Sequence, residues 1–168
     1  HQHLGVVPDV VTMAKALGNG VPIGACWARA EVADVFEPGD HATTYGGQPL
    51  ATAAARAVLA VMEAEDVPAR ATRAGATLTA ALERLPAVAE VRGLGLLVAA
   101  ELVPGIDARR VAADALAKGL VVNAVTPSAL RLAPSLLVTD EEIDRALWVL
   151  AAALDAVVET TPGLEAAP

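Results

Sequence analysis

The sequence is poor in several residue types, and each shortage argues against a class of protein. Only 2% of its 168 residues are aromatic, which argues against a nucleic-acid module that works by base stacking. The formal net charge of −8 argues against a protein that binds a phosphate backbone. The single cysteine, Cys26, can form neither an intrachain disulfide nor a Cys-rich zinc site. We expect Cys26 to be a small buried apolar residue in a reducing compartment.

Long apolar runs are also lacking, although 55% of the residues are hydrophobic and the mean hydropathy is +0.50. Charges, glycine or proline interrupt every candidate span before about 18 apolar residues accumulate. We therefore expect a soluble, cytoplasmic protein with neither membrane nor nucleic acid as a partner. The histidines His1, His3 and His41 lack metal-ligand spacing, so no metal site is expected. His1 stands in place of an initiator methionine, and we expect the chain to be a piece of a longer one.

Hydrophobic periodicity and helix signals predict an α/β chain. Short apolar runs bounded by Gly and Pro indicate buried strands, and Gln48 and Pro49 open an Ala-rich helix. The last helix opens with "TDEE", a capping box of Thr139 and Glu142. The expected strands are 9–13, 23–28, two within 88–102, 120–125 and 129–133; the expected helices are 49–65, 68–85, 107–119 and 139–157.

Lys15 is the sharpest candidate for chemistry. The stretch "VVTMAKALGNGVPIGA", residues 10–25, places one of the chain's two lysines between an apolar run and three glycines. A charge there is solvated, paired or neutralised by a covalent bond. Desolvation would lower the pKa of the lysine amine and make it a nucleophile for carbonyls. On spacing alone, a surface-turn lysine is favoured over a reactive one.

Four segments in order resemble the class III, pyridoxal-phosphate-dependent aminotransferases. "PDVVTMAKALGNGVPIGA" is similar to the family's cofactor-lysine segment, PD-x-x-T-x-AK-x-LGGG-x-PIGA. "HATTYGGQPLATAAA" resembles its threonine segment, and "VRGLGLLVAAEL" its R-G-x-GLL segment. "GLVVNAVTPSALRLAPSLLVTDEEID" resembles its C-terminal substrate segment, in the form found in the acetylornithine aminotransferases.

The resemblance implies a cofactor and a role for each site residue. Lys15 would hold pyridoxal phosphate as a Schiff base and then move a proton during transfer. Thr44 matches the threonine that binds the cofactor phosphate of the other subunit, which implies a homodimer with shared sites. Thr43 matches a neighbouring position associated with substrate, and Arg131 the arginine that grips the substrate α-carboxylate. From the residues alone, the two threonines form a capped loop, and Arg131 is a strand arginine paired at the surface.

The resemblance also implies the fold and the reaction. Residues 1–85 would end a fold-type I large domain, 86–158 would form the small C-terminal α/β domain, and 159–168 a tail. The acetylornithine branch moves the terminal amino group of N2-acetylornithine to 2-oxoglutarate in arginine synthesis. Ornithine, succinylornithine, succinyldiaminopimelate and 4-aminobutyrate aminotransferases share the lysine and threonine segments and remain alternatives. A non-catalytic remnant that acts as a dimerisation module is the rival from another class.

The sequence departs from the family pattern at three positions. Asn19 replaces a glycine, Gln48 an asparagine and Ser135 a proline, and none of these removes a reacting group. We expect Asn19 to tolerate left-handed backbone. Arg92 and Glu101 are interpreted as structural. The family's pyridine-nitrogen aspartate, phosphate loop and ring-stacking aromatic precede its cofactor lysine and are absent from these 168 residues, so we expect the isolated chain to have little or no transaminase activity.

Overall fold

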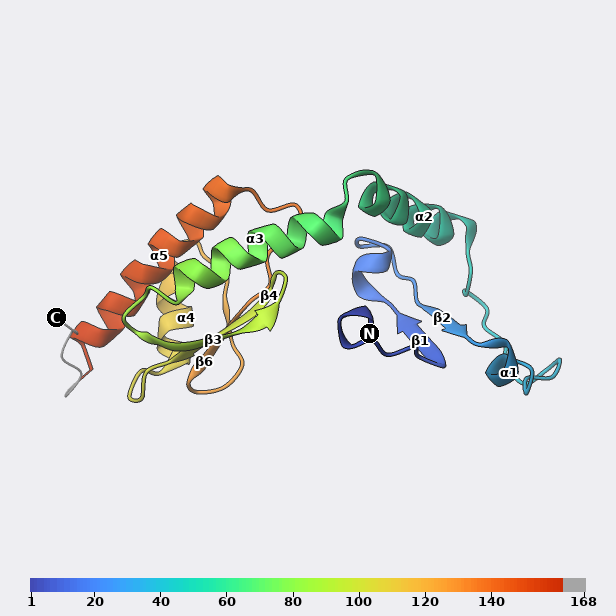
Figure 1. Ribbon diagram of the computed structural model, residues 1–168, viewed down its shortest axis with the longest axis horizontal. Helices are drawn as coiled ribbons and strands as arrows, with labels where there is room; N and C mark the ends of the chain where they lie inside the picture. Colours follow the sequence, from blue (N-terminus) through green and yellow to red (C-terminus); the bar gives the residue numbers. More distant parts are fainter. Residues whose placement is uncertain (162–168) are drawn as a thin grey trace. The chain divides into compact units, whose positions relative to one another are not determined.

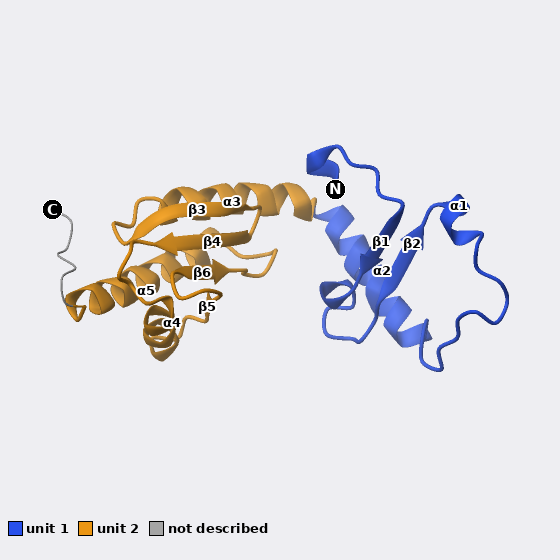
Figure 2. Cartoon of the chain, turned by 90° about the horizontal axis from the view of Figure 1, so that it is seen from below, with its two compact units in different colours: residues 1–65 blue, residues 66–168 orange. Residues whose placement is uncertain are grey.

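Contacts divide the chain into two compact units. A computed structural model describes residues 1–161, so most of the expected tail, 162–168, lies outside the described residues. Unit 1 is His1–Glu65 and unit 2 is Asp66–Pro168 (Figure 2). The expected second helix belongs by its contacts to unit 2, so the contact boundary precedes that helix. The division into domains at residue 85 stays a prediction.

Unit 1 is a two-stranded antiparallel ribbon with helical segments (Figure 1). The strands pair with Val10 opposite Ala28 and Met13 opposite Ala25. Helix α2 begins with Pro49 as predicted, and the turn η2 contacts it. The elements are η1 (Gln2–Leu4), β1 (Val10–Met13), η2 (Lys15–Leu17), β2 (Ala25–Ala28), α1 (Ala30–Ala33) and α2 (Pro49–Ala64).

The prediction that the strands of unit 1 are buried is wrong for this structure. Met13 of β1 is 42% exposed and Trp27 of β2 is 49% exposed. Cys26 is exposed as well, contrary to the interpretation of it as a buried residue. The physical reason is that two strands paired with each other supply no layer to cover their side chains. An apolar strand sequence shows a need for cover without showing what provides it.

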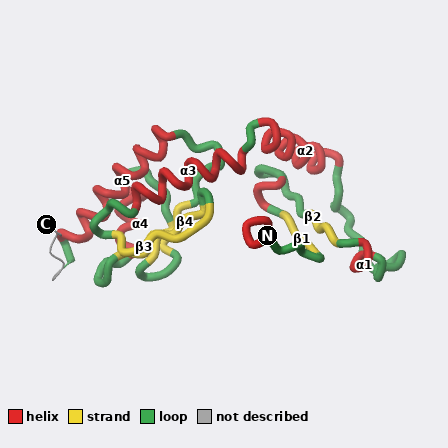
Figure 3. Tube along the Cα trace, viewed as in Figure 1, coloured by secondary structure: helices red, strands yellow, loops and turns green. Residues whose placement is uncertain are grey.

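Unit 2 packs helices against a four-stranded antiparallel sheet (Figure 3). The strand order is β3-β4-β6-β5, and every neighbouring pair is antiparallel. The expected strand 120–125 is reduced to two residues. The elements are α3 (Val67–Leu82), β3 (Val88–Leu94), β4 (Leu97–Leu102), α4 (Ala108–Ala117), β5 (Asn123–Ala124), β6 (Ala129–Leu132) and α5 (Asp140–Glu159).

The core of unit 2 follows from alternation along its strands. On β4, Val98, Ala100 and Leu102 are buried, whereas the residues between them are at least partly exposed. The buried positions join Leu130 of β6 and Leu150 of α5 in one apolar cluster. Helix α3 contacts β3 and β4, while α4 contacts β5 and β6. The other face of the sheet carries the charged residues Arg92, Glu101 and Arg131 together with the exposed Leu94 and Leu97.

Local signals explain where the helices of unit 2 begin and end. Both hydrogen bonds of the predicted capping box form between Thr139 and Glu142 at the start of α5. Asp107 caps α4 by accepting from the backbone N–H of Arg109 at 2.9 Å. After α4, the N–H of Leu120 bonds back to the carbonyl of Ala115, so the chain is still closing the helix where a strand was expected. Within residues 1–161, no helix combines the length and apolarity needed to cross a membrane.

Candidate active site

Lys15 sits on a strained turn directly after β1. Ala14 is still extended, and Lys15 then has a φ of 55°, in the left-handed region. Such a conformation costs a non-glycine residue about 1–2 kcal/mol. The turn is closed by hydrogen bonds from Leu17 N–H to Ala14 and from Gly18 N–H to Lys15, at 3.1 and 3.2 Å. The side chain of Lys15 is exposed and has no hydrogen bond or ion pair within residues 1–161.

The loop after Lys15 depends on backbone that few residues tolerate. Gly18 is buried, and a Cβ added there would lie 2.1 Å from the carbonyl oxygen of Val21. Asn19 and Gly20 follow with φ values of 46° and 104°. Asn19 therefore adopts the left-handed backbone expected of it, and its replacement of glycine does not prevent this turn.

Thr43 and Thr44 lie in the exposed loop between α1 and α2. A Cβ added to Gly46 would lie 2.2 Å from Cγ2 of Thr43, so the Thr43 side chain rests against the α carbon of that glycine. Gly47 turns the chain with a φ of 68° before Gln48 and Pro49 begin α2. Because α2 contacts η2, unit 1 packs the helix that follows the threonines against the turn that carries Lys15.

Arg131 lies in unit 2, on the solvent-exposed face of the sheet. It is the exposed residue of β6 between the buried Leu130 and Leu132. It stands opposite Ala99 of β4 and Asn123 of β5. Its guanidinium has no hydrogen bond or ion pair among the described residues 1–161. An unpaired guanidinium can bind a carboxylate with two parallel hydrogen bonds.

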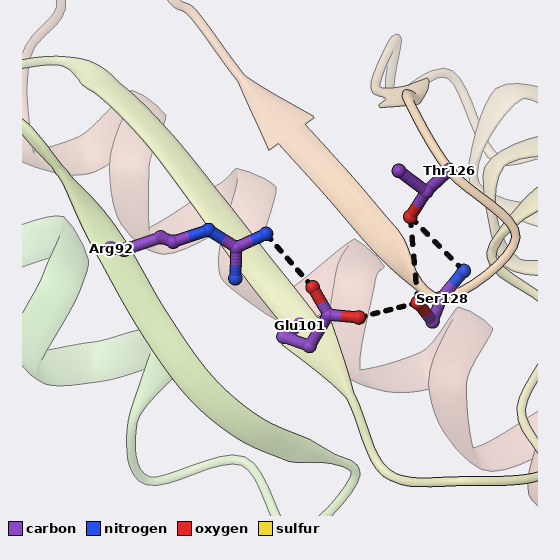
Figure 4. A network of polar contacts seen from close by, with 4 residues as sticks. All are labelled: Arg92, Glu101, Thr126 and Ser128. Carbon is purple, nitrogen blue, oxygen red and sulfur yellow. Dashed lines mark hydrogen bonds and ion pairs between the residues drawn. The ribbon is translucent and has the colours of Figure 1, made fainter.

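A polar network joins β3 and β4 of the same sheet to the loop between β5 and β6 (Figure 4). Arg92 Nη2 donates to Glu101 Oε2 at 2.9 Å, and the hydroxyl of Ser128 donates to Glu101 Oε1. The hydrogen bond from Ser128, followed by that from Arg92, lowers the pKa of the Glu101 carboxyl below its ordinary value of 4.5. The backbone N–H of Ser128 in turn donates to the hydroxyl oxygen of Thr126 at 3.3 Å.

Sequence reasoning singled out neither Ser128 nor Thr126, and it interpreted Arg92 and Glu101 only as structural. Alternation along β4 places Glu101 on the face opposite the core. The contact between Glu101 and Ser128 joins residues 27 positions apart, so it depends on the strand order rather than on any local motif. The four predicted site residues, by contrast, each lie in a recognisable segment.

Comparisons with known protein sequences all point to one family. Residues 1–154 match the sequence model of the class-III aminotransferases. The chain is 49% identical to the acetylornithine aminotransferase of Mycolicibacterium smegmatis over 163 residues, 95% of this chain and 41% of that protein. It is 47% identical to the acetylornithine aminotransferase of Corynebacterium efficiens over 154 residues, 92% of this chain and 38% of that protein.

Solved structures agree with the sequences. The ornithine aminotransferase of Toxoplasma gondii superposes with a TM-score of 0.86 and 37% identity, over 94% of this chain and 39% of that one. The N-acetylornithine aminotransferase of Stenotrophomonas maltophilia gives 0.83 and 36%, over 95% and 43%. The α/β fold is thus that of the pyridoxal-phosphate-dependent aminotransferases of fold-type I. The chain spans about two fifths of the length of these relatives. On the family match and these likenesses together, it belongs to the class-III aminotransferases.

Proposed function

We propose that the enzyme carrying this chain transfers the terminal amino group of N2-acetylornithine to 2-oxoglutarate, with pyridoxal phosphate as its cofactor. The observation that carries the proposal is Lys15 itself. Lys15 lies in the segment that resembles the family's lysine segment, and its backbone adopts a strained left-handed conformation with a φ of 55°. Similarity to acetylornithine aminotransferases at 47–49% identity supports the choice of amino donor.

The residues of the chain fit the chemical groups of the cofactor. The primary amine of Lys15 has no hydrogen bond or ion pair among the described residues, so it is available to condense with an aldehyde. Thr44 offers a hydroxyl and a backbone N–H in an exposed loop, which suit a phosphate. When bound, pyridoxal phosphate supplies an aldehyde that condenses with amines and a ring that accepts an electron pair from the substrate carbon.

Each site residue then has a defined role. The Lys15 amine would hold the cofactor and would also take a proton from the substrate carbon that bears the reacting nitrogen. The Arg131 guanidinium binds the α-carboxylate at the other end of the donor. Thr43 would contact the substrate. A donor with an ω-amine and an α-carboxylate offers its amine end to Lys15 and its carboxylate to Arg131.

The first test locates the cofactor. Borohydride reduction of the loaded enzyme, followed by digestion and mass spectrometry, is expected to leave the pyridoxyl group on the peptide that contains Lys15. Lys118, the other lysine of this chain, is the internal control, because it pairs with Asp114 on α4. A label on Lys118, or on neither lysine, would contradict the proposal without any measurement of activity.

The second test concerns the dimer. If each site combines Lys15 of one subunit with Thr44 of its partner, Lys15→Ala and Thr44→Val are both inactive as homodimers. A heterodimer of the two variants has one site with both residues intact. Unfolding and refolding an equimolar mixture should therefore restore about a quarter of the parent activity. An inactive mixture that contains heterodimer would show that the sites are not shared.

Ornithine is the second candidate donor, favoured by the TM-score of 0.86 to an ornithine aminotransferase. The two donors share the α-carboxylate and the terminal amine, so Arg131 and Lys15 serve both. They differ at the α-nitrogen, which is a neutral amide in N2-acetylornithine and a charged ammonium in ornithine. If kcat/KM for N2-acetylornithine divided by kcat/KM for ornithine is above one, the first proposal is supported; a ratio below one supports ornithine.

We place the enzyme in the cytoplasm; fractionation of cells that express it tests this.

A further inference from the structure

We propose that Arg92 and Ser128 hold the Glu101 carboxylate away from Arg131, so that the Arg131 guanidinium stays available to a substrate carboxylate. The inference rests on the proposed function, because it concerns how Arg131 is kept free. It makes Arg92, Glu101 and Ser128 positioning residues that set the preference of the site for donors with an α-carboxylate.

The register of the sheet places a carboxylate within reach of two arginines. Arg92, Ala99 and Arg131 stand opposite one another on β3, β4 and β6. Residues paired in this way project to the same face. Glu101, two residues beyond Ala99, projects to that face as well and is a diagonal neighbour of both arginines. Diagonal neighbours are about 7–8 Å apart at the backbone, which long side chains can span.

The structure pairs Glu101 with Arg92 (Figure 4), and Arg131 has no ion pair or hydrogen bond within residues 1–161. Both carboxylate oxygens are engaged, Oε2 by Arg92 at 2.9 Å and Oε1 by Ser128. Thr126 completes the arrangement. The Ser128 hydroxyl donates its only proton to the carboxylate of Glu101. In the 3.4 Å contact between the hydroxyls of Thr126 and Ser128, Thr126 must therefore be the donor. Glu101 is thus fixed from two sides.

Without Arg92, the neighbours of Glu101 would turn it toward Arg131. Glu90 of β3 stands directly opposite Glu101 in the register. Two carboxylates facing each other across strands repel, and Arg92 offsets this repulsion in the native sheet. Once Arg92 is removed, the nearest cation on the same face is Arg131, on the side away from Glu90. An ion pair there would compete with the substrate carboxylate for the same guanidinium.

The test compares two donors in the complete, cofactor-loaded enzyme. A single-turnover reaction with N2-acetylornithine, followed by the absorbance of the cofactor, gives the apparent Kd of a carboxylate donor. 1,4-Diaminobutane gives that of a donor without a carboxylate. Arg92→Met is expected to raise the Kd of the first about two- to fivefold, the range in which an exposed ion pair competes, and to leave the second unchanged.

A double variant and a charge control make the result specific. In Arg92→Met/Glu101→Gln the competitor is neutral, so the Kd of N2-acetylornithine should return to the parent value. A structural defect caused by losing Arg92 would not be rescued in this way. Arg110→Met, on α4, removes the same side chain and charge away from the sheet, and both Kd values should stay unchanged. Ser128→Ala frees one oxygen of Glu101 without changing the charge and should raise the Kd in the same direction.

The role of Arg131 is measured in parallel. If Arg131→Gln weakens both donors equally, the proposed role of Arg131 fails. If it weakens only N2-acetylornithine while Arg92→Met and Ser128→Ala do not, the proposed function stands and the inference about Glu101 is overturned. A rise in Arg92→Met that persists in the double variant overturns it as well. Should Arg92→Met not fold, the Ser128→Ala result decides.

Discussion

Gly75, in the middle of α3, gives the sharpest test of the packing of unit 2. In an exposed helix interior, replacing glycine with alanine stabilises a protein by about 1 kcal/mol. At Gly75 the new Cβ would lie 2.1 Å from the carbonyl oxygen and 2.4 Å from the carbonyl carbon of Gly95, against 3.4–4 Å for ordinary contact. Helix and hairpin would therefore have to separate by more than 1 Å.

The clash cannot be relieved by a side-chain rotation, because the opposing atoms are backbone. Gly95 forms the turn between β3 and β4 with a φ of 55°. Gly93, two residues earlier, has as little room, because a Cβ added there would lie 2.2 Å from the carbonyl oxygen of Leu97. Overpacking of a well-packed core costs about 1–3 kcal/mol. With the upper value for a backbone clash and the helix-propensity gain set against it, Gly75→Ala should lower the free energy of unfolding by about 2 kcal/mol.

Denaturant unfolding shows whether Gly75→Ala lowers or raises the free energy of unfolding. Hydrogen exchange of the α3 amides shows whether that change lies in unit 2. Ala76→Gly, at the exposed neighbouring position, is the matched control and should cost about 1 kcal/mol through helix propensity. If Gly75→Ala instead raised the stability by the amount that Ala76→Gly lowers it, helix propensity would outweigh the contact. The close approach of α3 to the hairpin would then be refuted.

Three further predictions concern the cap of α5, the titration of Glu101 and the isolated chain. Thr139→Ala removes one hydrogen bond of the capping box and should cost about 1 kcal/mol in denaturant unfolding, whereas Thr139→Ser should cost little. The lowered pKa of Glu101 contributes stability that is present above pH 4.5 and lost as the pH falls through the folded value. By carboxyl NMR, Ser128→Ala should raise that pKa, and no change would contradict the hydrogen bond. The 168-residue chain alone should show no transamination and should bind a hydrophobic dye, because Trp27 and Met13 are exposed; full turnover would refute this.

Local sequence signals predicted the helices α2 to α5 well, whereas the short helix α1 was not expected. Pro49 and the pair Thr139 and Glu142 set helix starts by chemistry confined to a few neighbouring residues, and the structure places them as expected. Strand 120–125 failed for an equally local reason that periodicity does not show, since the turn at Gly119 keeps Leu120 bonded to α4. Turn residues such as Gly119 therefore determine where a helix ends and a strand begins, which the apolar pattern alone does not define.

The candidate site was only partly accessible from sequence. A family segment identified Lys15, but its left-handed backbone depends on the path from β1 into η2 and has no signature in residue type. The segment containing Arg131 was recognised too, although a surface pairing was the expectation from residues alone and the structure leaves it unpaired. The hydrogen bond between Glu101 and Ser128 follows from β4 and β6 being neighbours, which no local pattern states.

The uneven distribution of the core has a consequence for how the two units can diverge. Within residues 1–65, Ala55 is the one hydrophobic side chain that is buried, whereas the apolar cluster of unit 2 is assembled from that unit's own helices and strands. Substitutions in unit 2 can be compensated by partners inside residues 66–161. The exposed apolar residues of unit 1 have no buried cluster of their own within residues 1–65 that could compensate a substitution. Across homologues, the apolar positions of unit 2 should therefore covary with one another more often than those of unit 1.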